Sequence, residues 1–339
     1  MVPKIFVFNS ICFIGYLLPI ALLTGPFLSD LFLSIIALYF LICSIYKKNW
    51  HYYDNSIVKI FFIFYIYILI NSLTSVDPAL SLEHSLFYFR YLFFCLGIIY
   101  LIDNNKNFTH YFSLFLYLGI FIAVISGLIE FIYFNFTSQN YSELRLGGVF
   151  GDEKILGKYL VHMLPLAFAM FYLKKEHTKI QLAMIMLILI MTDITIYVSG
   201  ERTSFFLATV ATILIILLVS RYRYLRLLTF SVSVVIIILF TFFIPQVKER
   251  IIDTTIIQLG LNEENLNILS PRHEGHFKSA YKMFLDKPIT GHGTKLFRVL
   301  CSNNKDNKYG GICSTHPHNI YLQLLAETGI IGFLPIMLI

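Results

Sequence analysis

The sequence predicts an all-α polytopic integral membrane protein. Of its 339 residues, 57% are hydrophobic and only 14% are charged, and the mean hydropathy is +0.73. Soluble domains carry charge on roughly 25% of their residues, so this composition is typical of a chain that lies mostly in lipid. About ten apolar windows, each near the roughly 20 residues that a helix needs to cross a bilayer, predict the spans: 5–23, 28–46, 57–73, 86–102, 111–134, 159–173, 180–198, 203–219, 227–244 and 319–339.

The basic residues predict the orientation of these spans. Lys and Arg are concentrated in every second loop, at 47–48, 106, 174–179 and 221–226. Loops rich in Lys and Arg stay in the cytoplasm, which places the N-terminus there as well. The first apolar stretch ends without a small-residue cleavage site, which indicates a signal anchor.

The chain divides into three parts on this basis. Residues 1–244 carry the first nine spans, and residues 318–339 form the last one. Between them lies one long polar segment, 245–317, which we expect to face outward and to contain short amphipathic helices.

Four ionisable residues are predicted to lie inside spans, in the outer half of the membrane. These are Arg90, Glu130, His162 and Asp193. Because charge in hydrocarbon is costly, such residues usually face a bundle interior or an aqueous cavity. They predict one polar cavity open to the outside; the alternative is a set of ion pairs that tie helices together.

Arginines mark the outer ends of the predicted helices. Arg202 opens one span, and Arg272 stands at the head of an amphipathic segment. The guanidinium group binds phosphate oxygens through two parallel hydrogen bonds and stays charged. Both residues therefore predict phosphate binding, with Arg145 and Arg90 as further candidates. The alternatives are a snorkelling anchor for Arg202 and a solvated loop residue for Arg272.

The segment "THPHN" precedes the last span. Pro317 suits the first position of a helix, so we expect His318 and Asn319 in the first turn. The positive end of the helix dipole keeps His318 neutral, which makes it the candidate base. Asn319 is a candidate to orient His318 or to bind a sugar. His316 is predicted to point elsewhere and to act on the site indirectly.

The same span carries an acid and two glycines. Glu327 lies nine residues below His318, about 14 Å along a helix, so a role in helix pairing is expected. Gly329 and Gly332 are expected to allow close helix packing.

These motifs together resemble the O-antigen ligase and polymerase superfamily. The resemblance lies in His318-Asn319 followed by Gly329-x-x-Gly332, in "SGERTSFF" (199–206) and in "SPRHEGHFKSAYKMFLDKPITGHG" (270–293). Family ligases usually have leucine four residues after the first arginine, where this chain has Phe206. The resemblance implies about twelve spans, roughly two more than the windows above.

The resemblance implies a bacterial inner-membrane glycosyltransferase with its active site facing the periplasm. The donor would be a preassembled glycan on undecaprenyl pyrophosphate, and the acceptor a lipid A-core sugar, as in lipopolysaccharide biosynthesis. His318 would be the base, while Arg202 and Arg272 would bind the pyrophosphate, and the reaction would invert the anomeric centre. A polymerase or a protein O-oligosaccharyltransferase would share these residues, and a glycan flippase is a more distant alternative.

The sequence lacks several common metal-binding and nucleotide-binding motifs. There is no Cys-x-x-Cys pair, no His-Glu-x-x-His motif and no Walker spacing, so we expect no metal, no cofactor and no nucleic-acid partner.

Cys301 and Cys313 are the only cysteines outside the predicted spans. If segment 245–317 faces an oxidising compartment, this pair is expected to form a disulfide. The alternative is two free thiols.

Overall fold

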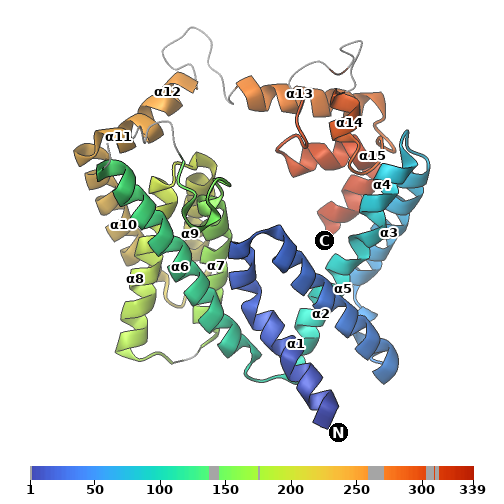
Figure 1. The fold of residues 1–339 in the computed structure, drawn as a ribbon, viewed down its shortest axis with the longest axis horizontal. Helices are drawn as coiled ribbons and strands as arrows, with labels where there is room; N and C mark the ends of the chain where they lie inside the picture. Colours follow the sequence, from blue (N-terminus) through green and yellow to red (C-terminus); the bar gives the residue numbers. More distant parts are fainter. Residues whose placement is uncertain (1, 137–144, 175, 259–270, 303–308, 310–312) are drawn as a thin grey trace. The chain divides into compact units, whose positions relative to one another are not determined.

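The computed structural model describes residues 2–136, 145–174, 176–258, 271–302, 309 and 313–339. Within these residues it is helical and contains no strand (Figure 1). The all-α membrane fold predicted from composition is therefore confirmed.

Among the described residues, nine helical segments are long and apolar enough to cross a membrane. The tenth predicted span is the shorter helix α9 (Arg202–Leu218), at 17 residues. Helices α4 (Pro78–Ser85) and α5 (Phe89–Asn104) follow each other through a short 3-10 turn and make one span together. The other segments are α1 (Val2–Ala21), α2 (Pro26–Lys47), α3 (Ser56–Leu73), α6 (Phe108–Phe136), α7 (Leu156–Leu173), α8 (Lys179–Val198), α10 (Arg223–Phe243) and α15 (Ile320–Leu338).

Side-chain caps begin several of these helices. The Asn55 side chain accepts the N–H of Ile57 at the start of α3. At the start of α8, Thr178 and Gln181 form a reciprocal capping box. These caps satisfy backbone N–H groups that the first turn of a helix leaves without partners.

The chain forms two compact units. Unit 1 comprises residues 1–32 and 101–257, and its core lies between α6, α7, α8, α9 and α10, with α1 packed on α6. Unit 2 comprises residues 33–100 and 258–339. In unit 2, α15 packs against both α3 and α13 (Pro271–Asp286).

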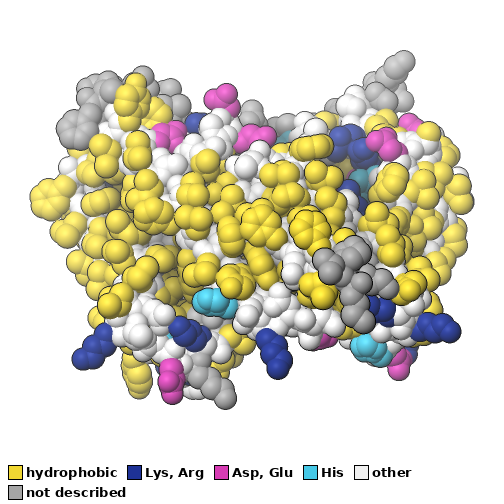
Figure 2. Space-filling model, turned by 60° about the horizontal axis from the view of Figure 1, so that its bottom comes forward, with side chains coloured by type: hydrophobic (Ala, Val, Ile, Leu, Met, Phe, Trp, Pro, Cys, Tyr) yellow, Lys and Arg dark blue, Asp and Glu magenta, His cyan; other side chains and the backbone are white. Residues whose placement is uncertain are grey.

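The outer surface of the helices is apolar. Phe6, Phe27 and Phe242 are among many large hydrophobic side chains that remain more than two-thirds exposed. Figure 2 shows hydrophobic side chains over most of the face that it draws, with charged groups toward its margins. Such a surface is expected where lipid, rather than water, surrounds the helices.

A buried ion pair joins α8, α9 and α10 within unit 1. Both nitrogens of the Arg226 fork donate to Asp193 at 2.9 Å, and Ser233 donates to the same carboxylate at 3.0 Å. Arg226 is fully buried and also donates to Thr212 of α9. The prediction that Asp193 lines an open polar cavity is therefore wrong, as is the placement of Arg226 in a cytoplasmic loop. A buried carboxylate needs a paired cation, and Arg226 from the first turn of α10 supplies it.

The other three in-span residues also have local partners. Glu130 forms an ion pair with Lys154 at 3.5 Å and accepts the N–H of Gly148. His162 contacts the Lys158 carbonyl at 2.6 Å through Nδ1. Arg90 belongs to unit 2, where its guanidinium lies 5.2 Å from the Tyr91 ring centre. Asp193 and Glu130 therefore form ion pairs that tie segments together, which was the alternative to a polar cavity.

Candidate functional site

The site begins at the N-terminus of α15, where Asn319 is the cap. Its Oδ1 accepts the N–H groups of Tyr321 at 3.0 Å and Leu322 at 3.1 Å. The helix therefore starts at Ile320, and the prediction that His318 and Asn319 lie in its first turn is wrong. An asparagine side chain satisfies the first free N–H groups, whereas a helix starting at Pro317 would leave this cap unused.

His318 lies immediately before the cap in an unusual backbone conformation. Its φ of 57° falls in the left-handed region, which a residue with a Cβ rarely adopts. The side chain is exposed. Strained residues of this kind cost roughly 1–3 kcal/mol and are found most often at functional sites. Lys48, Tyr222 and Lys295 share this conformation, so it is the strain together with the sequence motif that marks His318.

Four imidazole rings gather at this point. The His318 ring centre lies 4.2 Å from that of His316, 5.2 Å from that of His276 and 5.7 Å from that of His273. The prediction that His316 points elsewhere is wrong: the left-handed turn at His318 brings the two rings together. Sequence reasoning missed His273 and His276, although they are three residues apart and therefore share a helix face.

Helix α13 supplies two of these histidines. His276 is 3% exposed, and Ala280 and Met283 continue its buried face into a cluster with Ala326 of α15. Since α13 begins at Pro271, Arg272 occupies its first turn, directly before His273. The side chain of Arg272 lies outside the described residues.

A break in α15 accommodates the loop after α13. Gly329 has φ 61° and ψ −168°, a combination that only glycine adopts readily. A Cβ here would lie 2.3 Å from the Ile289 carbonyl oxygen. The freed N–H groups of Ile330 and Ile331 bond instead to Pro288 and Ile289.

Helix α3 supports the same break with two polar side chains. Tyr67 donates to the carbonyls of Thr290 and Thr328 at 2.8 Å, and Asn71 donates to Thr290 at 2.7 Å. Gly332 packs against Tyr67, as expected for a glycine at a helix contact. Gly329, by contrast, serves the break and the loop, so its predicted role in helix packing is corrected.

Glu327 joins α15 to the start of helix α14 (Phe297–Ser302). Its carboxylate accepts the N–H of Phe297 at 3.2 Å and the side-chain amide of Gln323 at 3.4 Å. Glu327 is 6% exposed. The carboxylate thus lies at the positive end of α14 and holds two helices of unit 2 together, as its expected pairing role requires.

Cys301 and Cys313 form a disulfide in the structure, with Cα atoms 5.5 Å apart. The bond ties the end of α14 to the segment that leads to His316. Cys12, Cys43 and Cys95 are free thiols within helices.

Arg90 belongs to a second group of basic residues in unit 2. Lys295, Arg298 and Arg90 are the cationic neighbours of His84. Lys295 also lies 3.8 Å from Glu83. Sequence reasoning identified Arg90 alone, because the other cations are distant in the chain: Lys295 precedes α14, and Arg298 lies in its first turn.

In unit 1, Arg145, Arg202 and Arg250 gather around the turn between α8 and α9. The N–H of Leu146 donates to the Ser199 carbonyl at 3.1 Å, which holds Arg145 beside this turn. Gly200, at φ 75°, leaves room for Arg250, whose Nε would lie 3.0 Å from a Cβ there. Arg202 donates to Thr255 at 2.9 Å. Arg250 was not identified from the sequence, since its position in the polar segment carries no local signal.

Glu201 organises this arginine group. Its carboxylate accepts the N–H of Gly157 at 2.7 Å and the hydroxyl of Ser204 at 3.1 Å. Burial raises the pKa of Glu201 above its usual range, and these hydrogen bonds and the charge of Arg145 oppose that rise. The carboxylate thus caps α7 and offsets part of the positive charge.

The imidazole cluster does not have the arrangement of a metal site. Within the described ranges, no three His, Cys, Asp or Glu side chains converge closely enough to hold a metal ion. The cluster offers four imidazoles, of which His273, His316 and His318 are exposed and His276 is buried.

Comparison with known proteins finds one family that matches the C-terminal part of the chain. Residues 182–337 match the family model described as O-antigen ligase, a range that includes Arg202, Arg272, His318 and the break at Gly329. No curated protein and no solved structure matches the chain. The matched region and the membrane fold agree, and both support a relation of this part of the chain to the O-antigen ligase and polymerase superfamily.

Proposed function

We propose that the chain transfers a preassembled glycan from undecaprenyl pyrophosphate to a lipid A-core sugar, with His318 as the base. The observation that carries this proposal is the exposed His318 ring, held in a strained conformation among three further imidazoles. Catalytic bases need a pKa near neutrality and access to the substrate, and imidazole meets both conditions.

In the proposed reaction, His318 accepts the proton of the acceptor hydroxyl as that oxygen attacks the anomeric carbon of the donor. The new carbon–oxygen bond forms while the bond to the phosphate oxygen breaks, and the electron pair leaves with the lipid pyrophosphate. Attack opposite to the leaving group inverts the anomeric centre. His276, buried and 5.2 Å from His318 between ring centres, is proposed to position the base.

Arginine is proposed to stabilise the departing pyrophosphate. Arg272 stands one residue from His273 in the first turn of α13, and Arg202 forms the arginine group of unit 1 with Arg145 and Arg250. Fixed guanidinium groups stabilise charge that develops on a leaving group without the help of a metal. Arg90, together with Lys295 and Arg298 of unit 2, is proposed to bind the substrate. Asn319 is already engaged as the cap of α15 and is not assigned a role in substrate binding.

The flippase alternative loses one of its supporting features. A flippase would need charged residues inside the membrane to line its transport path, but Asp193 is buried in an ion pair with Arg226. A residue locked in this way supports helix packing and not the passage of a substrate.

Purified protein, reconstituted with the lipid-linked donor and lipid A-core, tests the proposal. His318→Ala should abolish transfer while donor binding persists, and His51→Ala, an exposed histidine elsewhere in unit 2, should leave transfer unchanged. Full activity of His318→Ala would remove the base assignment. The product separates the family's reactions: glycan on lipid A-core indicates a ligase, a longer lipid-linked glycan a polymerase, and glycan on Ser or Thr a protein O-oligosaccharyltransferase.

The proposal also places the chain in the bacterial inner membrane, with its N-terminus in the cytoplasm and segment 245–317 in the periplasm. Cysteine labelling of intact cells tests this orientation. Labelling of the loop at 174–179 from outside would contradict it.

A further inference from the structure

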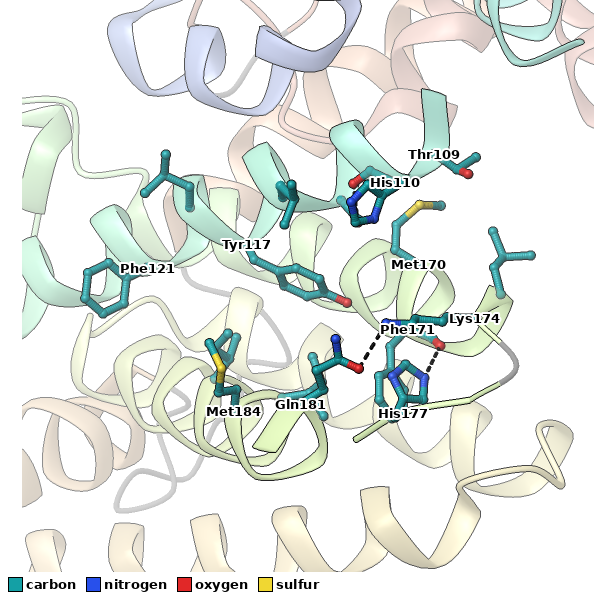
Figure 3. A pocket seen from close by; sticks show the side chains of 16 residues that line it. Thr109, His110, Tyr117, Phe121, Met170, Phe171, Lys174, His177, Gln181 and Met184 are labelled. Atoms are coloured by element: carbon teal, nitrogen blue, oxygen red, sulfur yellow. Dashed lines mark hydrogen bonds between the residues drawn. The ribbon is translucent and has the colours of Figure 1, made fainter. Parts of the chain in front are cut away.

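A cavity of about 720 Å³ opens between α6, α7 and α8 of unit 1. Figure 3 shows polar side chains at one end of it, including His110, Lys174, His177 and Gln181. The remainder is lined by apolar side chains, among them Leu118, Phe121, Met184 and Ile188. The cavity therefore has the two-part character of a lipid, with a polar end and an apolar length.

The polar end is held in place by hydrogen bonds. Lys174 donates to Oε1 of Gln181 at 2.9 Å, and Gln181 is itself part of the capping box of α8 (Figure 3). His177 bonds to the Phe171 carbonyl at 3.0 Å, and its ring stacks on that of Phe171 with centres 4.0 Å apart. An ammonium group and two imidazoles thus stand at the mouth of an otherwise apolar cavity.

The length of the cavity matches one leaflet of a bilayer. Its lining on α6 extends from Thr109 to Phe121, and the twelve helical steps between these residues span about 18 Å. The hydrocarbon core of a bilayer is about 30 Å thick, so this is close to half of it. An acyl chain of a lipid in one leaflet would cover the same depth.

We propose that this cavity binds one anionic glycerophospholipid of the leaflet that meets Lys174. The phosphate would lie beside Lys174 and His110, and an acyl chain would follow Leu118, Phe121 and Ile188. Basic pockets between transmembrane helices are suited to anionic headgroups. The apolar lining excludes a free phosphate as the sole occupant.

This site is distinct from the proposed pyrophosphate site. Helix α8 runs from Lys179, next to the cavity mouth, to Val198, next to the turn that carries Arg202. The two ends of α8 are about 28 Å apart, so the bound phospholipid is not the glycan donor in another pose.

Lipid titration of the delipidated full-length protein in detergent, followed by native mass spectrometry, tests the proposal. The probes are phosphatidylglycerol and phosphatidylcholine with identical acyl chains. We expect about fivefold tighter binding of phosphatidylglycerol. Both lipids carry the phosphate, but the quaternary ammonium of phosphatidylcholine cancels its charge, and the attraction of one basic side chain to a net anionic lipid corresponds to about a factor of five. Equal binding of the two lipids would overturn the proposal, and so would a preference for undecaprenyl phosphate.

Two variants locate the binding. Lys174→Gln should remove the preference for phosphatidylglycerol, whereas Lys106→Gln makes the same charge change near the start of α6, outside the cavity lining, and should preserve it. Leu118→Trp should fill the apolar part and weaken both lipids. Equal loss in Lys174→Gln and Lys106→Gln would mean general surface attraction and would refute the site, even if Leu118→Trp fails to fold.

Discussion

Removing one partner of the Asp193–Arg226 ion pair should severely destabilise unit 1. In Arg226→Met the Asp193 carboxylate keeps Ser233 as a donor but loses both guanidinium hydrogen bonds. The two side chains are 0% and 5% exposed, so water cannot replace the missing charge. Loss of one member of a buried pair typically costs about 3–5 kcal/mol, and we expect a loss of this size.

Equilibrium unfolding in mixed detergent micelles measures this loss. The double variant Arg226→Met with Asp193→Leu removes both charges and should recover most of the stability, because apolar replacement of a whole buried pair is often neutral. Arg221→Met is the matched control. Arg221 lies over the Tyr222 ring at 4.7 Å on the partly exposed surface, so its loss should cost no more than about 1 kcal/mol.

Two results would refute the reasoning. The first is a free energy of unfolding for Arg226→Met that lies within about 1 kcal/mol of that of the parent protein. It would mean that Asp193 is not a buried, charged carboxylate. The second is a double variant as unstable as the single one, which would mean that packing of the arginine side chain matters more than its charge.

Three further predictions concern the candidate site and its support. Arg202→Lys should insert normally but transfer glycan at a severely reduced rate, because lysine keeps the charge and loses the paired donors; a normal rate in a reconstituted assay would show that charge suffices. Gly329→Ala should lower the free energy of unfolding by at least about 1–3 kcal/mol, since the new Cβ meets the Ile289 carbonyl in a backbone region reserved for glycine; an unchanged unfolding curve would contradict the break in α15. Thiol counting on denatured, unreduced protein should find three free thiols, and reduction of Cys301–Cys313 should cost up to about 3 kcal/mol; five thiols would rule out the bond.

The amino-acid sequence alone determined where the helices lie. Each predicted apolar window coincides with a helical segment, because the need to satisfy every backbone group inside a bilayer leaves helices as the only choice for runs of about 20 apolar residues. The sequence also identified His318 and Arg202, because they lie in short motifs with fixed spacing. It identified the cysteine pair because both cysteines lie outside the apolar windows. Their catalytic roles remain predictions.

Tertiary structure decided which polar residues meet. Arg226 reads as a loop residue in the sequence, yet it pairs with Asp193, 33 positions earlier. His273 and His276 lie in a segment that resembles the family, but the sequence assigned them no role, and their rings approach that of His318 only because α13 packs on α15. These contacts depend on how helices pack, which periodicity does not encode.

The ends and breaks of helices show the same division at the level of single residues. Pro317 predicts a helix start by itself, but the Asn319 cap moves the start to Ile320 and leaves His318 in a left-handed turn. Gly329 reads as a packing glycine, but the loop from Pro288 to Gly291 requires it to break the helix. Local sequence preferences predict roughly where a helix begins or ends. The hydrogen bonds that neighbouring segments can make determine the residue at which it does so.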